Sequence, residues 1–131
     1  PLGWGSTGLG TQLAAEGTKP LSSHYRNTFK LADASRVASV TLTTRADDGV
    51  VVYVNGKEVA RANMPAGPIT HNSYATAAPS TAVALATPVV VTVPGSAFVT
   101  GTNVISAEVH SNYRNTPSSS FALTASVSVK K

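Results

Sequence analysis

The stretch Arg45-Ala-Asp-Asp-Gly-Val-Val-Val-Tyr-Val-Asn-Gly-Lys-Glu-Val59 decides the fold of this chain. Asn55-Gly56 suits a type I′ hairpin turn, because both central residues of that turn need a positive φ. The run from Val50 to Val54 is β-branched and aromatic, as in a strand that is buried on both faces. Two adjacent carboxylates, Asp47 and Asp48, stand in the turn before it. The stretch therefore predicts a strand end, an acidic turn and a hairpin.

Short alternating segments flank this stretch. Apolar and polar residues alternate over 23–31, 37–44, 103–110 and 120–129, and a further strand is predicted over 87–93, where Pro94-Gly95 ends it. The residues predicted to face inward are Val40, Leu42, Ile105, Ala107, Val109, Phe121, Leu123, Ala125, Val127 and Val129. One helical turn is predicted in 96–100, a long loop with one short strand in 60–80, and irregular structure in 1–21. Seven or eight short strands with Gly and Pro turns predict an all-β sandwich.

The composition favours a single extracellular module. A chain of 131 residues suits one domain with one core. Charged residues make up only 12%, against about 25% in typical domains, so Thr, Ser and Asn supply much of the polar surface. Because the chain opens on Pro1-Leu-Gly-Trp4, without an initiator Met or a signal peptide, we expect residues 1–131 to be one module of a longer secreted protein.

Several partner classes are disfavoured by the same composition. The ten basic residues that give the net charge of +4 are scattered and form no cluster with aromatic residues, so we expect no nucleic-acid partner. No apolar run approaches the roughly 18 residues of a membrane span. The chain contains no cysteine, which excludes disulfides, thiolate metal sites and a thiol nucleophile.

Six motifs together resemble a known class of domain. They are Leu9-Gly10, Tyr25-Arg26-x-x-Phe29, Asp47-Asp48-Gly49-x-x-x-Tyr53-x-Asn55-Gly56, Arg61-x-Asn63-Met64-Pro65, Gly101-x-Asn103-Val104 and Glu108-Val109-His110. From about Leu9 onward the chain resembles the galactose-binding-like jelly-roll accessory modules (carbohydrate-binding-module-like) of secreted bacterial multidomain enzymes, and also the sugar-binding domains of β-galactosidase-type enzymes. The Asp-Asp-Gly and Asn-Gly element is shared with domains of the anthrax protective-antigen type. The resemblance implies a jelly-roll β-sandwich of about eight antiparallel strands and, in many members, a structural calcium.

Asp47 and Asp48 are the predicted metal ligands. The resemblance implies that an adjacent Asp pair holds Ca²⁺, which in turn holds sugar hydroxyls, and carboxylate oxygens suit this ion. The alternative is that both side chains accept backbone N–H bonds and fix the turn, with Arg45 or Arg61 as an ionic partner. The resemblance also implies antiparallel pairing of the last strand with 37–44, which would place the 112–119 loop beside the acidic turn.

The predicted carbohydrate-binding residues are Trp4, Tyr74, Asn112, Tyr113 and Arg114. Flat aromatic rings grip the C–H faces of sugars, Asn both donates and accepts hydrogen bonds, and Arg forms forked bonds to hydroxyls or to a uronate. Tyr74 and Tyr113 lie in polar loops and are the predicted platforms, whereas Trp4 is either a platform or a core anchor. The alternative for the 110–117 segment is an ordinary surface loop.

Other residues are expected to serve the fold. Tyr53 is predicted in the core, because it lies within the buried run. His110 is predicted to cap the adjoining loop through its ring nitrogens, and Asn63-Met64-Pro65 to fix the long loop. The segment from His71 to Tyr74 is a secondary binding candidate, with a plain surface loop as its alternative.

No catalytic set is present in the sequence. Glycosidases need two carboxylates about 5–9 Å apart across a cleft, whereas Asp47 and Asp48 are neighbours on a turn. A serine nucleophile elbow, a His-x-x-x-His zinc helix and a phosphate-binding Gly loop are also missing. The sequence therefore predicts a non-catalytic module that binds polysaccharide or oligosaccharide and targets an attached catalytic domain to it. The alternatives are a ligand-free spacer, which would present an apolar patch to its neighbour, and a cell-surface adhesion module.

Overall fold

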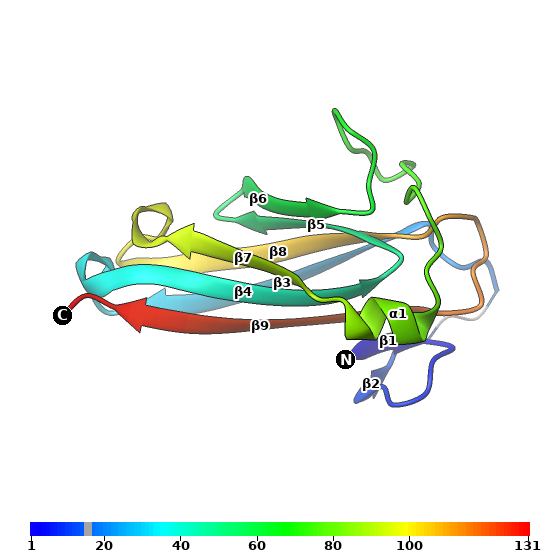
Figure 1. The fold of residues 1–131 in the computed structure, drawn as a ribbon, viewed down its shortest axis with the longest axis horizontal. Coiled ribbons are helices and arrows are strands. Elements are labelled where there is room, and N and C mark those ends of the chain that lie inside the picture. Colours follow the sequence, from blue (N-terminus) through cyan, green and yellow to red (C-terminus); the bar gives the residue numbers. More distant parts are fainter. Residues whose placement is uncertain (15–16) are drawn as a thin grey trace.

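The computed structural model describes residues 1–14 and 17–131 and shows a two-sheet β-sandwich (Figure 1). The five-stranded sheet has the order β2-β1-β9-β4-β7 and the four-stranded sheet the order β3-β8-β5-β6. The first sheet contains β1 (Leu2–Trp4), β2 (Thr11–Gln12), β4 (Val37–Asp47), β7 (Val89–Pro94) and β9 (Ser119–Val129). The second contains β3 (Ser22–Leu31), β5 (Gly49–Val54), β6 (Lys57–Ala62) and β8 (Gly101–His110). All pairs except β1–β2 are antiparallel, so the predicted all-β jelly-roll class is confirmed.

Helical segments in the described residues are short. They are η1 (Ala34–Arg36), α1 (Thr81–Ala86) and η2 (Gly95–Ala97). η2 confirms that a helical turn forms here, but it begins one residue before and ends three residues before the predicted range 96–100. α1 was not predicted from the sequence, and it begins where the Ser80 hydroxyl accepts a hydrogen bond from the Val83 N–H at 3.4 Å. None of these helices, within the part of the chain that the structure describes, has the length and apolarity needed to cross a membrane.

The pairing of β4 with β9 decides where the loops lie. In this antiparallel pair Arg45 stands opposite Ala122 and Asp47 opposite Ser120. Because β4 ends where β9 begins, the turn after Asp47 and the loop before Ser119 lie at the same end of the sandwich, at the right of Figure 1. The predicted juxtaposition of the acidic turn and the 112–119 loop is confirmed.

The core contains the predicted inward residues of three strands. Val40 and Leu42 of β4, Ile105, Ala107 and Val109 of β8, and Phe121 of β9 are all buried. β5 is buried on both faces, because Val50, Val52 and Val54 face the core while Val51 packs under Met64 and Ala75 of the 63–80 loop. Tyr53 is not a core residue as predicted, because it shares the outer face of Val51 and remains partly exposed at the border of that small cluster.

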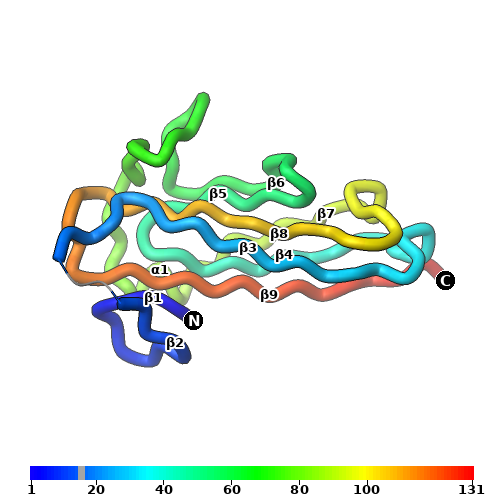
Figure 2. Tube along the Cα trace, turned by 180° about the vertical axis from the view of Figure 1, so that it is seen from behind, coloured from blue at the N-terminus to red at the C-terminus, as the bar shows by residue number. Residues whose placement is uncertain are grey.

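The second half of β9 departs from the predicted burial. Its alternation predicts that Ala125, Val127 and Val129 face inward, yet Ala125 is exposed and the two valines are 49% and 62% exposed. β1 pairs with β9 only from Ser119 to Phe121. Figure 2 shows β9 running on well past β1 toward the C-terminus, and the inward side chains Leu123, Ala125 and Val127 of its second half line an open space beside β3 instead of packing in the core.

Candidate functional site

Asp47 and Asp48 form a buried acidic turn at the end of β4. The two residues are 5% and 9% exposed, and the peptide bond between them is cis. Asp47 Oδ2 accepts a hydrogen bond from Thr81 Oγ1 at 2.8 Å, and the Asp47 carbonyl accepts one from Ser119 Oγ at 3.0 Å. Asp48 Oδ2 accepts a hydrogen bond from the Asn112 N–H at 2.8 Å. These contacts match the turn-fixing alternative of the sequence analysis, and they tie α1 and the 111–118 loop to β4.

The two hydroxyl groups that hold Asp47, those of Thr81 and Ser119, were not predicted from the sequence. Thr81 is the first residue of α1, and Ser119 is the first residue of β9. A Ser-Thr pair ahead of the Ala-rich run 82–86 is a helix-start signal. The helix that carries Thr81 could therefore have been predicted from the sequence. Nothing in the sequence distinguishes Ser119 from its serine neighbours, because its role depends on the register of β9 against β4.

The prediction that Arg45 or Arg61 pairs with a carboxylate of the acidic turn is wrong. Arg61 instead forms a two-pronged pair with Glu58, with both N–O distances at 2.8 Å. Its Nη1 also donates to the carbonyls of Pro65 and Gly67, at 2.6 and 2.8 Å. Arg45 Nε donates to the Leu85 carbonyl at 2.9 Å and so fastens the end of α1.

Burial raises the pKa of Asp48 to about 6, although the hydrogen bond from the Asn112 N–H favours the charged form and opposes this rise. The neighbouring Asp47 side chain raises the pKa further. Because the folded pKa lies above the ordinary value of 3.8, the folded state binds this proton more tightly than the unfolded state. The contribution of Asp48 to stability is therefore complete below about pH 3.8 and is lost as the pH rises through about 6.

Replacing Asp48 with Asn is expected to flatten this pH dependence. Relative to the parent chain, D48N should gain about 1 to 2 kcal/mol in free energy of unfolding between about pH 4 and pH 7, because one pKa unit is worth about 1.4 kcal/mol and the carboxyl retains some solvent contact. Urea unfolding at a series of pH values measures this difference. D33N is the matched control, because the pKa of exposed Asp33 is lowered by hydrogen bonds from Ser35 and its titration lies below this window. Equal slopes for D48N and the parent chain would contradict the prediction.

The 63–80 loop is fastened across the same end of the sandwich. The Ala75 N–H donates to the Ser111 carbonyl at 3.1 Å, and Asn112 Nδ2 donates to the Ala75 carbonyl at 2.7 Å. Asn63 Nδ2 donates to the carbonyls of Asp48 and Ala77, at 3.1 and 2.8 Å. Asn63 thus fixes the long loop, as predicted, and no strand forms within residues 63–80.

His110 is the buried support of this loop. Its side chain is fully buried, with Nδ1 2.8 Å from the Ser73 carbonyl and Nε2 3.3 Å from Glu108 Oε2. His110 does hold a loop through a ring nitrogen, but the prediction that this is the adjoining 111–119 loop is wrong, because Nδ1 reaches Ser73 of the 63–80 loop. The secondary candidates His71 and Asn72 are exposed on this loop, and the His71 carbonyl accepts a hydrogen bond from Ser22 Oγ at 3.1 Å.

Tyr74 and Tyr113 are exposed on two adjoining loops, at 41% and 47%. Each tyrosine stands next to a residue of the contact between Ala75 and Asn112, so that contact carries both rings at one end of the molecule. Arg114 is exposed beside Tyr113. We refer to Tyr74, Asn112, Tyr113 and Arg114 as the loop-end surface.

Trp4 is a core anchor and not part of the loop-end surface. Its side chain is 5% exposed, and Nε1 donates to the Thr116 carbonyl at 3.4 Å. β1 brings it opposite Ser119, under the 111–118 loop. The platform alternative for Trp4 is therefore wrong, because its ring has no face free for a sugar.

The acidic turn supplies only part of a calcium site. Ca²⁺ takes six to eight oxygen ligands, and among the described residues no group of three or more His, Cys, Asp or Glu side chains gathers to hold a metal. Asp47 and Asp48 alone do not fit the ion, because most of its coordination would have to come from carbonyls, amide oxygens, water or a ligand. Calcium at this turn stays a prediction.

Comparison with known proteins supplies a fold likeness. A similar fold occurs within one α-L-rhamnosidase chain. A crystal structure of Streptomyces avermitilis α-L-rhamnosidase complexed with L-rhamnose matches 86% of this chain with a TM-score of 0.56 and 19% identity, over 9% of that chain. An α-L-rhamnosidase from Dictyoglumus thermophilum matches 84% of this chain with a TM-score of 0.48 and 9% identity, over 12% of its length. No family model and no curated protein sequence matches, and the chain spans about a tenth of the length of these enzymes.

Proposed function

We propose that this chain is a non-catalytic accessory domain that binds polysaccharide through its loop-end surface and targets an attached catalytic domain to that polymer. The observation that carries the proposal is the exposure of Tyr74 and Tyr113 on adjoining loops, beside Asn112 and Arg114. Exposed aromatic rings next to planar hydrogen-bonding groups suit the alternating C–H and hydroxyl surface of a sugar chain.

Attachment to a carbohydrate-active enzyme is part of the proposal. A similar fold makes up 9% of the S. avermitilis α-L-rhamnosidase chain, which supports a role as one part of a larger secreted enzyme. The buried acidic turn supports a role without catalysis, since Asp47 and Asp48 serve as hydrogen-bond acceptors inside the fold. A weak site of this kind is useful by avidity, because it raises the effective concentration of the linked enzyme at a polymeric target.

Affinity electrophoresis of the domain through gels that contain neutral or uronic polysaccharides tests the proposal. We expect retardation by at least one polymer, and a loss of affinity of about 2- to 10-fold in each of Y74A and Y113A, from the usual contribution of an aromatic contact. R114A should weaken binding most on a uronic polymer, because a guanidinium pairs with carboxylates.

The control is V99A, since Val99 is an equally exposed apolar residue at the opposite end of β8. V99A should migrate like the parent chain on every polymer. Retardation that survives in both tyrosine variants would overturn the assignment of the loop-end surface, and no retardation on any polymer would overturn carbohydrate binding. Loss of retardation in EDTA, restored by Ca²⁺ in the parent chain but not in D48N, would assign the metal to the acidic turn.

A ligand-free structural module is the second candidate function. Val127 and Val129 are 49% and 62% exposed on the inward face of β9, which is the apolar patch expected of a domain that packs against a neighbour. The apolar patch by itself is compatible with carbohydrate binding, because the patch and the loop-end surface lie on different parts of the molecule.

A further inference from the structure

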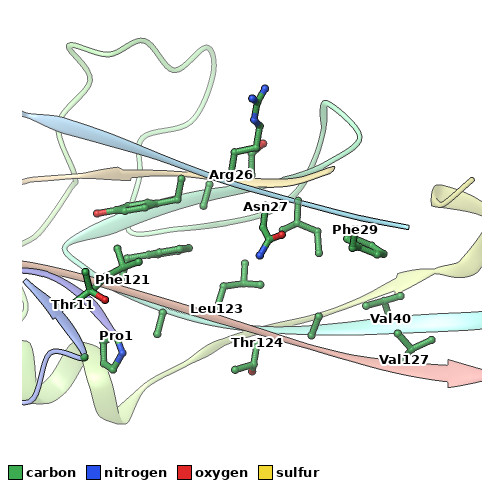
Figure 3. A pocket seen from close by; sticks show the side chains of 18 residues that line it. Pro1, Thr11, Arg26, Asn27, Phe29, Val40, Phe121, Leu123, Thr124 and Val127 are labelled. Carbon is green, nitrogen blue, oxygen red and sulfur yellow. The ribbon is translucent and has the colours of Figure 1, made fainter. Parts of the chain in front are cut away.

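An apolar cleft with a volume of about 820 Å³ opens between β3 and β9. Figure 3 shows side chains from the two strands facing each other across it, with Asn27 and Phe29 on one side and Leu123 and Val127 on the other. At one end the ring of Tyr25 stacks on Phe121 with a centroid distance of 4.4 Å. The cleft is an unfilled extension of the core.

The edge of β9 along this cleft is free over most of its length. β1 pairs with β9 through Leu2–Phe121, Gly3–Ser120 and Trp4–Ser119. From Ala122 to Val129 the only strand beside β9 in the described residues is β4, on the other side. A free edge presents a row of backbone N–H and C=O groups that can pair with another strand.

The sequence along this edge has the alternation expected of a strand with one buried face. Leu123, Ala125, Val127 and Val129 alternate with Thr124, Ser126 and Ser128. Period-two alternation of this kind is typical of a strand with one buried face. Val127 and Val129 are exposed, so the apolar face that this alternation predicts to be buried is not buried within the described residues.

We propose that this cleft receives an extended polypeptide strand with aliphatic side chains at alternate positions, which pairs antiparallel with Ala122–Val129 and continues the line of β1. The strand is supplied by the longer polypeptide that carries the domain, so the inference rests on the proposed attachment but not on carbohydrate binding. Backbone pairing to an edge, with alternate side chains in an apolar cleft, is the general way in which a sheet accepts a peptide strand.

The geometry at Pro1 suits such a continuation. The Pro1 carbonyl accepts hydrogen bonds from the N–H groups of Gly10 and Thr11, at 2.8 and 3.3 Å, and so points toward β2 and away from β9. Because the N and C=O of one strand residue point to the same side, the N–H that proline lacks is not one that β9 needs. A residue that precedes proline is also restricted to extended conformations, as a strand requires.

The register of β1 defines which side chains of the added strand enter the cleft. Leu2 stands opposite Phe121, so a strand that continues β1 places its residues two, four and six positions before Leu2 opposite Leu123, Ala125 and Val127. A shift by one residue would turn every aliphatic side chain to solvent.

Two full-length fusions of identical composition test this inference. One carries Thr-Val-Thr-Val-Thr-Val directly before Pro1, with its valines in the positions that face the cleft, and the other carries Val-Thr-Val-Thr-Val-Thr. The first fusion should raise Tm by about 5 to 10 °C and slow amide exchange in Ala122–Val129 at least about tenfold, because it buries three valines and pairs the edge. The second should match the unextended chain in both measurements.

Lysine substitutions in the first fusion check the position of the added strand. V127K places a charge in the cleft and should cancel the gain in Tm, whereas S126K on the opposite face of β9 should keep it. Equal Tm and exchange for the two fusions would overturn the proposal. Protection of the Ala122–Val129 amides by polysaccharide, or by dimerisation of the unextended chain, would also overturn it by assigning the cleft to another occupant. Neither Tm nor amide exchange in these fusions depends on polysaccharide binding by Tyr113. Failure of the strand proposal can therefore be distinguished from failure of the proposed function.

Discussion

Replacing Asn103 with alanine is expected to lower the free energy of unfolding by about 3 to 4 kcal/mol. Asn103 is fully buried, and its amide group forms four hydrogen bonds. Nδ2 donates to the carbonyls of Val99 and Gly101, at 2.7 and 3.1 Å, and Oδ1 accepts from the Val99 N–H at 2.9 Å and from Asn55 Nδ2 at 3.0 Å. The substitution leaves these groups without a partner in the interior, and that cost exceeds the loss of the bonds alone.

Urea unfolding followed by the fluorescence of Trp4, the only tryptophan, measures this loss. N103D should be about as destabilising as N103A, because it removes both donors and buries a charge. N27A is the control, since Asn27 is exposed on β3, and it should change stability by less than about 0.5 kcal/mol. A loss below about 1 kcal/mol in N103A would show that the network does not stabilise this end of the sandwich.

The second large effect is expected from replacing His110 with alanine, which should cost about 2 to 4 kcal/mol. The substitution removes a fully buried ring and leaves the Ser73 carbonyl without the partner that now lies 2.8 Å away. Because this contact supports the 63–80 loop, amide exchange in that loop should accelerate more than exchange in β4. Retardation by polysaccharide should weaken as well, although His110 has no exposed surface, since Tyr74 depends on the loop for its position.

Hydrogen exchange compared between H110A and H24A separates the local effect from general destabilisation. His24 is exposed on β3, so H24A should leave both stability and loop exchange unchanged. If H110A lowers stability while the 63–80 loop keeps its relative protection, His110 acts through core packing and not as the support of the loop.

The strands were predictable from sequence because each rests on a local pattern. Alternation identified Val40 and Leu42 as core residues, and both are buried. Asn55 and Gly56 adopt φ values of 49° and 82°, as their turn chemistry requires. The pairing of the last strand with 37–44, which places the 112–119 loop beside the acidic turn, was implied by the resemblance and not by a local pattern.

The errors arise where a side chain depends on a distant or irregular feature. Arg61 pairs with Glu58 because the pairing of β5 with β6 shifts at Val59, and this bulge brings residues 58 and 61 to the same face of the strand. Regular alternation would have placed them on opposite faces. Trp4 is buried by a loop more than a hundred residues away in sequence, at Thr116, and no local pattern reports that contact.

The solvent exposure of a side chain, which the sequence does not give, decides which predicted aromatic residues are available to a sugar. Sequence treated Trp4, Tyr74 and Tyr113 as three aromatic candidates, whereas the structure buries the first and exposes the other two. The burial of Trp4 follows from the pairing of β1 with the start of β9, which only the assembled sheet reveals.

The small cluster of Val51, Met64 and Ala75 on the outer face of β5 has a consequence for recognition. It packs the 63–80 loop against the sheet with side chains that water does not reach, so the loop loses its conformational freedom when the chain folds and not when a ligand arrives. A sugar that docks against Tyr74 would meet a rigid surface. Its binding should therefore lack the large unfavourable entropy of loop ordering, and its association rate should be that of a preformed site.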